Sequence, residues 1–141
     1  MLVFGQRSEA INLKTRRYSA IAMGIDRMLC VDDEKLCRNM LRMYFQESLT
    51  PHVDIAEDYN SAMQQIRENE YDLIILDSLG GDCFKIHREI QDIPHGDLII
   101  FSGCYKTQEE AGKMGIPFYH KLGSVSNLDE IVKKYKQPAI E

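Results

Sequence analysis

Short apolar runs alternate with segments of helical periodicity from residue 27 onward, and this alternation constrains the fold more than any other feature. The runs cover residues 28–31, 52–56, 73–76, 98–101 and 116–120. Each run is followed by a segment in which apolar residues recur at helical spacing. Strands that alternate with helices over connections this short must be joined by right-handed crossovers, which produce a parallel sheet. We therefore predict an α/β fold with five strands and five helices.

Two prolines and two fully apolar runs indicate the order of the strands. Pro51 and Pro117 mark the second and fifth strands as edges, because proline cannot donate to a central ladder. Runs 73–76 and 98–101 are apolar on both faces, as expected for a sheet that is covered by helices on each side. The sequence thus predicts a doubly wound sheet with the strand order 2-1-3-4-5.

Local signals suggest where individual helices begin. Thr107 and Glu110 have the spacing of a capping box for the fourth helix, and Ser126 is a candidate N-cap of the last one. Asp33 is a candidate cap of the helix that follows the first strand.

One domain accounts for most of the 141 residues. We assign residues 27–136 to this domain and residues 137–141 to a C-terminal tail. Residues 1–26 form an N-terminal extension without clear periodicity. This extension is interpreted as a flexible arm, as a short helix on the domain, or as a segment that precedes a biological start at Met23.

Composition excludes several classes of protein. The formal charge of −5 argues against direct nucleic-acid binding, and no apolar stretch is long enough for membrane insertion. No secretory signal precedes the domain. The cysteines show neither CxxC nor zinc-site spacing, which favours reduced thiols and a cytoplasmic location; they are Cys30, Cys37, Cys83 and Cys104.

Polar residues that can carry chemistry follow four of the strands. Asp32 and Asp33 follow the first strand, Asp77 the third, Ser102 the fourth and Lys121 the fifth. Sites in open parallel sheets form beyond the carboxyl ends of the strands, near the point where the strand order reverses. Each residue alone has an ordinary explanation as a cap, a turn residue or a surface charge. Their joint placement at one rim predicts a site.

The three carboxylates cannot all stay ionised at close range unless a cation lies among them. Hard oxygen ligands of this kind suit Mg²⁺ (or Mn²⁺). With such a cation, Asp77 can act as a nucleophile toward phosphorus while Lys121 and Ser102 hold phosphoryl oxygens. The predicted product is an acyl phosphate on Asp77.

The sequence at this point resembles the receiver domain of bacterial two-component response regulators, a flavodoxin-like α/β fold. The resemblance covers residues 27–136 and depends on Leu29-Cys30-Val31-Asp32-Asp33-Glu34, Leu73-Ile74-Ile75-Leu76-Asp77, Ile100-Phe101-Ser102-Gly103 and Phe118-Tyr119-His120-Lys121. It implies that a histidine kinase or a histidine phosphotransfer protein donates the phosphoryl group in a two-component phosphorelay. It also implies that Asp33, Asp77 and the carbonyl of Leu79 bind Mg²⁺, with Asp32 acting mostly through water.

The resemblance further implies a switch. Ser102 and an aromatic residue on the fifth strand would shift on phosphorylation, and this residue is Phe118, three before the lysine, or its neighbour Tyr119. The shift would alter the face made by helix 4, strand 5 and helix 5, through which a downstream protein or a second copy could bind.

Two departures from the family pattern concern the rim. The loop 78–82 is short and lacks the usual Met-Pro step, and Leu122 follows Lys121 where the family usually has proline. Apolar Leu79 and neutral Cys104 offer no group that activates water, so we expect slow hydrolysis of the acyl phosphate.

Three functional interpretations compete. The first is a stand-alone receiver that is not an enzyme beyond its own phosphorylation and dephosphorylation, and that signals through protein contacts. The second is a degenerate, receiver-like module that binds partners constitutively. The third, an aspartyl phosphatase, needs a second acid two residues after the nucleophile, where this chain has Leu79.

Overall fold

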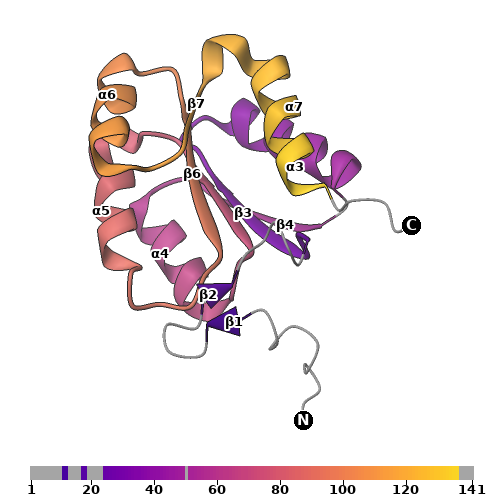
Figure 1. Cartoon of the computed structure of the whole chain (residues 1–141), viewed down its shortest axis with the longest axis vertical. Coiled ribbons are helices and arrows are strands. Elements are labelled where there is room, and N and C mark those ends of the chain that lie inside the picture. The colour runs from indigo at the N-terminus through magenta and orange to yellow at the C-terminus, as the bar shows by residue number, and fades with distance from the viewer. Residues whose placement is uncertain (1–10, 13–16, 19–23, 50, 137–141) are drawn as a thin grey trace.

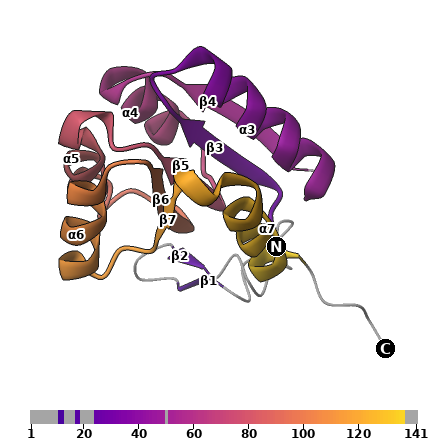
Figure 2. The same cartoon turned by 90° about the horizontal axis from the view of Figure 1, so that it is seen from above.

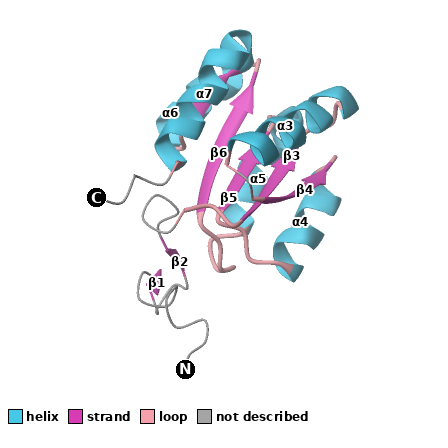
Figure 3. Ribbon diagram, turned by 90° about the vertical axis from the view of Figure 1, so that its right-hand side faces the viewer, coloured by secondary structure: helices cyan, strands magenta, loops and turns pink. Residues whose placement is uncertain are grey.

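A five-stranded parallel sheet forms the centre of the computed structural model, which describes residues 11–12, 17–18, 24–49 and 51–136 (Figure 1). The spatial order of its strands is β4-β3-β5-β6-β7. These strands are β3 (Arg27–Val31), β4 (His52–Ala56), β5 (Leu73–Leu76), β6 (Asp97–Ser102) and β7 (Phe118–His120). Neighbouring strands all run in the same direction, and Figure 3 shows β3, β5 and β6 side by side. The predicted order 2-1-3-4-5 is confirmed, with the strands after Pro51 and Pro117 at the edges.

In the described part of the chain, five helices cover the two faces of the sheet, as predicted. α3 (Lys35–Ser48) and α7 (Ser124–Tyr135) lie on one side. α4 (Tyr59–Glu68), α5 (Asp82–Glu89) and α6 (Tyr105–Met114) lie on the other (Figure 2). All four side chains of β5 are buried, because this central strand packs against helices on both faces. The apolar core is consequently divided into two clusters, one on each side of the sheet.

The predicted helix starts are wrong in two places. α6 begins at Tyr105 after Cys104, and Thr107 is a buried residue inside the helix rather than its cap. α7 follows Gly123, so Ser126 also lies within its helix. The structure instead has a capping box at Asp58 and Ser61, before α4. Capping spacing alone did not locate the helix starts, because Thr107 packs on the inner face of α6.

Two further predictions change in detail. The last strand begins at Phe118 rather than Ile116, and Asp33 does not cap α3, whose N-cap is Glu34 without a side-chain hydrogen bond. All four cysteines are free, and Cys30 is buried as an apolar residue of β3.

The described part of the N-terminal extension contains two short strands. β1 (Ile11–Asn12) and β2 (Arg17–Tyr18) pair in antiparallel orientation. The hypotheses about the remainder of residues 1–23 and about the tail 137–141 fall outside the described residues. Within the described part of the chain, no helix is both long and apolar enough to cross a bilayer.

Candidate functional site

The rim at the carboxyl ends of the parallel strands brings the predicted acids together. Asp32 follows β3, and its N–H donates to the Ala56 carbonyl at 3.1 Å. Asp77 follows β5, and its N–H donates to the Val31 carbonyl at 2.8 Å. The ladder on both sides of β3 therefore continues as far as the acids and fixes where their side chains emerge.

Asp32, Asp33 and Asp77 form what we call the acidic pocket. One oxygen from each of the three carboxylates lies within 4.8 Å of the others. Asp32 and Asp77 are buried, while Asp33 is exposed to solvent. This set of hard oxygen donors, partly open to water, fits Mg²⁺, which retains several waters and prefers carboxylate ligands.

Lys121 supplies the positive charge opposite the acids. It lies in the 3-10 turn η2 (Lys121–Gly123) directly after β7, and its Nζ donates to Asp32 Oδ2 at 2.7 Å and to Asp77 Oδ1 at 2.9 Å. Burial lowers the pKa of Lys121, but the hydrogen bonds to both carboxylates outweigh it, so its pKa is raised above the usual value. The lysine is therefore charged, and it reaches the pocket although Leu122 replaces the family's proline.

Two side chains at the start of α3 belong to this site and were missed from the sequence. Arg38 donates from Nη1 to the Asp32 carbonyl at 2.8 Å, and its Nη2 lies 3.8 Å from a carboxylate oxygen of Glu57. The pKa of the Cys37 thiol is raised to about 12. Burial is the largest cause of this rise, and a hydrogen bond with Asp32 is the second. The only sequence signal was their position in the first turn of the helix after the acid pair.

The short loop after Asp77 turns back on the acceptor carboxylate. Leu79 has a positive φ of 50°, an uncommon conformation for a residue with a side chain, and its N–H donates to Asp77 Oδ2 at 3.3 Å. Gly80 and Gly81 also have positive φ and form the 3-10 turn η1 (Leu79–Gly81) with it. The loop thus orients one oxygen of Asp77 while Lys121 holds the other.

The candidate switch residues lie on β6 and β7. Ser102 is buried at the end of β6, where its Oγ accepts a hydrogen bond from the Cys104 N–H at 3.1 Å. Phe118 packs against the cluster on the α4–α6 side of the sheet, and Tyr119 packs against the opposite cluster. Phe101 belongs to the same cluster as Tyr119, and the side chain of Ser102 points to the opposite face of β6. Of the two aromatic candidates, Phe118 is therefore the one that shares a face of the sheet with Ser102.

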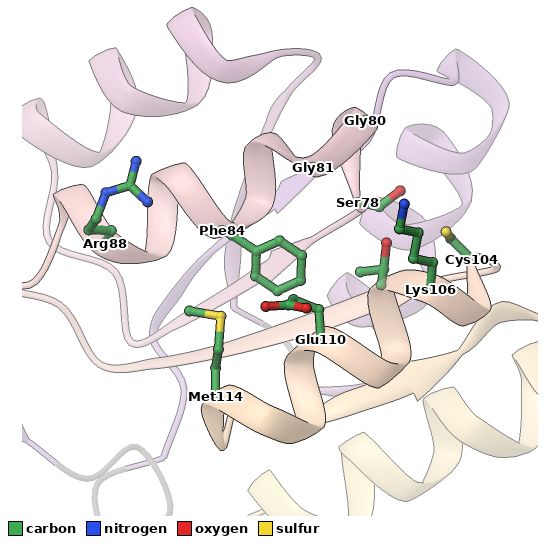
Figure 4. A pocket seen from close by; sticks show the side chains of 10 residues that line it. Ser78, Gly80, Gly81, Phe84, Arg88, Cys104, Lys106, Glu110 and Met114 are labelled. Carbon is green, nitrogen blue, oxygen red and sulfur yellow. The ribbon is translucent and has the colours of Figure 1, made fainter.

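A separate hollow of about 660 Å³ lies between α5 and α6, beside the acidic pocket (Figure 4). Phe84 and Met114 contribute apolar surface, and the cations Arg88 and Lys106 come from the two different helices. Ser78 and Cys104 also line it, and they come from the same loops that carry Asp77 and Ser102. The hollow and the acidic pocket therefore share the loop that carries Asp77, although none of the three pocket acids lines the hollow.

Two solved receiver domains and a solved response regulator protein are similar to this structure in fold. The receiver domain of Francisella response regulator 1452 is 25% identical and superposes with a TM-score of 0.63, covering 78% of this chain and 96% of its own. The receiver domain of NtrC4 from Aquifex aeolicus is 28% identical with a TM-score of 0.63, over 77% and 93% of the two chains. TrrA from Thermotoga maritima, solved with Mg²⁺ and BeF, is 24% identical with a TM-score of 0.60, over 78% and 98%.

Sequence comparison adds a family match. A search of curated proteins finds no match to this chain. The family model described as "Response regulator receiver domain" matches residues 28–116, a segment that contains all three acids of the pocket and Ser102. Because this match covers more than half of the chain and agrees with the fold and the acidic pocket, the protein belongs to the response regulator receiver domain family.

Proposed function

We propose that this protein is a phosphorylation-dependent signalling receiver that accepts a phosphoryl group on Asp77 from a phosphohistidine donor in the presence of Mg²⁺. The observation that carries the proposal is the bridge from Lys121 Nζ to both Asp32 and Asp77, beside a third carboxylate. A structural ion pair needs one acid and one base. Three acids around one lysine leave a negative charge that suits a divalent cation and phosphoryl transfer.

The proposed step is an in-line displacement at phosphorus. A carboxylate oxygen of Asp77 forms the new P–O bond as the P–N bond of the donor breaks, and the leaving imidazole takes up a proton from water. Lys121 and Ser102 would hold oxygens of the phosphoryl group. Asp33, Asp77 and the Leu79 carbonyl would hold Mg²⁺, with Asp32 acting through water. The bound cation would supply positive charge against the charge on the transferring group.

Apolar side chains close to the rim support docking of a protein donor, either a histidine kinase or a histidine phosphotransfer protein. Leu36, Leu122 and Val125 are 85%, 77% and 69% exposed. All three follow the carboxyl ends of β3 and β7 by a few residues, so they lie on the side of the acidic pocket. Exposed leucines near a charged site suit a contact that excludes water. Leu122→Asp should therefore slow transfer from a phosphorylated histidine phosphotransfer protein, while phosphorylation by acetyl phosphate stays unchanged.

The proposed output is a protein contact through the face formed by α6, β7 and α7, with an unknown downstream protein or a second copy of the chain as the partner. Tyr105 of α6 is 66% exposed and its ring centroid lies 4.3 Å from that of His120 on β7. A change at the rim could thus reach an exposed aromatic group directly. We expect the protein to act on no substrate other than its own phosphoryl group, and to work in the cytoplasm with its four thiols reduced.

Intact mass spectrometry tests the central step. The protein is incubated with Mg²⁺ and acetyl phosphate or phosphoramidate, and one added phosphoryl group is expected. Asp77→Asn should abolish the adduct, whereas Asp82→Asn, which changes an exposed acid of the following helix, should retain it. An adduct that survives in Asp77→Asn, or no adduct on the wild type, would refute the proposal and favour a module that binds its partners without phosphorylation.

A further inference from the structure

His120 carries a buried nitrogen that makes no hydrogen bond. Its Nε2 is the one buried side-chain nitrogen or oxygen without a partner in the described part of the chain. The ring lies close to two aromatic side chains, with centroid distances of 4.3 Å to Tyr105 and 6.1 Å to Phe118. Burying an unpaired donor is unfavourable for folding, so such a group calls for an explanation in function.

Leu122 determines which ring nitrogen of His120 carries the proton. The Leu122 N–H donates to His120 Nδ1 at 3.1 Å, so Nδ1 is an acceptor and the neutral ring holds its proton on Nε2. Proline at position 122 could not make this hydrogen bond, because it has no N–H. The departure from the family pattern at residue 122 and the histidine at residue 120 are therefore parts of one arrangement.

The register of β6 and β7 puts His120 beside Ser102. The two residues are Cα partners in the parallel ladder, so their side chains lie on the same face of the sheet. A serine hydroxyl has one proton to donate and two acceptor positions. In Ser102 the Cys104 N–H fills one acceptor position. If the hydroxyl proton is donated to a phosphoryl oxygen, one acceptor position remains, and His120 Nε2–H is the unpaired donor on that face.

We propose that His120 is a positioning residue for Ser102, and that its Nε2–H donates to Ser102 Oγ when the serine hydroxyl turns to a phosphoryl oxygen. This inference rests on the proposed phosphorylation of Asp77. The donor orients the hydroxyl and polarises it, since hydrogen bonds in a chain strengthen one another. The unpaired nitrogen of the resting state then gains a partner in the phosphorylated state, which favours that state.

Three substitutions separate this role from a packing role. His120→Phe keeps a ring beside Tyr105 but removes both the Nε2–H donor and the Nδ1 acceptor, and His120→Gln keeps an N–H donor near the position of Nε2. Relative to the wild type, His120→Phe should slow the phosphorylation of Asp77 by acetyl phosphate about two- to tenfold, the effect of one hydrogen bond. His120→Gln should recover most of that rate. The melting temperature of His120→Phe should change little, because removal of an unpaired buried donor offsets the loss of the acceptor for the Leu122 N–H, which lies in an exposed turn.

A double-mutant cycle identifies the partner. In a Ser102→Ala background, His120→Phe should cause no further loss of rate, because the residue through which it acts is gone. His52→Gln, at an exposed histidine on the far edge strand, serves as the control and should leave the rate unchanged.

The possible outcomes are distinct. Equal rates for the wild type and His120→Phe, or a further loss in the Ser102→Ala background, would overturn the role of His120 and leave the proposed function intact. A slower rate together with a lower melting temperature that Gln does not rescue would show a packing role and would also overturn it. A wild type that is never phosphorylated would overturn both proposals.

Discussion

Replacing Lys121 with methionine tests the electrostatics of the acidic pocket directly. At an effective dielectric constant of about 20, each of its two contacts, at 2.7 and 2.9 Å, attracts by about 6 kcal/mol before desolvation is subtracted. Desolvation offsets most of this attraction, yet removing one partner of a buried pair typically costs about 3–5 kcal/mol. Because the lysine side chain is 23% exposed, we expect the lower end of that range, about 3 kcal/mol.

Urea denaturation in the absence and presence of Mg²⁺ measures this effect. Without Mg²⁺, Lys121→Met should lose about 3 kcal/mol of unfolding free energy, equivalent to a fall of about 10 °C in melting temperature. Adding Mg²⁺ should stabilise the variant more than the wild type, because a cation among the carboxylates replaces the missing charge. Lys106→Met, at an exposed lysine of α6, is the matched control and should change little. A variant within 1 kcal/mol (about fivefold in the folding equilibrium) of the wild type, with no greater response to Mg²⁺, would refute the reasoning.

Three further predictions concern hydrolysis, thiol reactivity and acid stability. The acyl phosphate should be long-lived in the wild type, and Leu79→Glu should shorten its half-life, measured by loss of the mass adduct, since a carboxylate can activate water. Hydrogen bonds from the hydroxyl and backbone N–H of Thr107 lower the pKa of the exposed Cys104 thiol, while burial raises the pKa of the other three cysteines, so limited iodoacetamide at neutral pH should label Cys104 first in peptide mapping. Partial burial opposes ionisation of Asp54, but hydrogen bonds, led by that from Tyr71, lower its pKa below 3.8. The stability that Asp54 contributes is present above this pH and lost as the pH falls through the lowered value, so Asp54→Asn should destabilise the protein more at pH 7 than at pH 3. Equal losses at both pH values would contradict this.

The strand ends were predictable because an apolar run stops where the strand leaves the core. Leu73–Leu76 is buried throughout, and the strand ends immediately before Asp77, whose carboxylate lies at the rim with those of Asp32 and Asp33. In a parallel sheet all such exits lie at one rim, so the sequence also predicted that Asp32, Asp33 and Asp77 would meet. The apolar runs of the strands and the positions of the acids directly after them were sufficient to predict this part of the site.

Contacts that depend on side-chain direction were not predictable in the same way. Arg38 reaches the Asp32 carbonyl across the first turn of α3, and no pattern in the sequence distinguishes it from an ordinary surface arginine. Thr107 had the spacing of a cap, yet it is buried against the sheet because α6 begins two residues earlier. Whether such a residue is a cap, a core residue or a surface residue depends on which side of its helix faces the sheet. That orientation is known only once the helix has been packed.

The turn that presents Lys121 shows how a missing proline is compensated in this chain. Asn127, in α7, donates from Nδ2 to the His120 carbonyl at 2.5 Å, and the Leu122 N–H donates to the His120 ring. A Cβ at Gly123 would lie 3.0 Å from Asn127 Nδ2, so the glycine leaves room for the amide to approach. Two hydrogen bonds to one residue thus hold the backbone on both sides of the lysine. Lys121 can be placed without a rigid ring at residue 122, because the restraint comes from α7 and from His120.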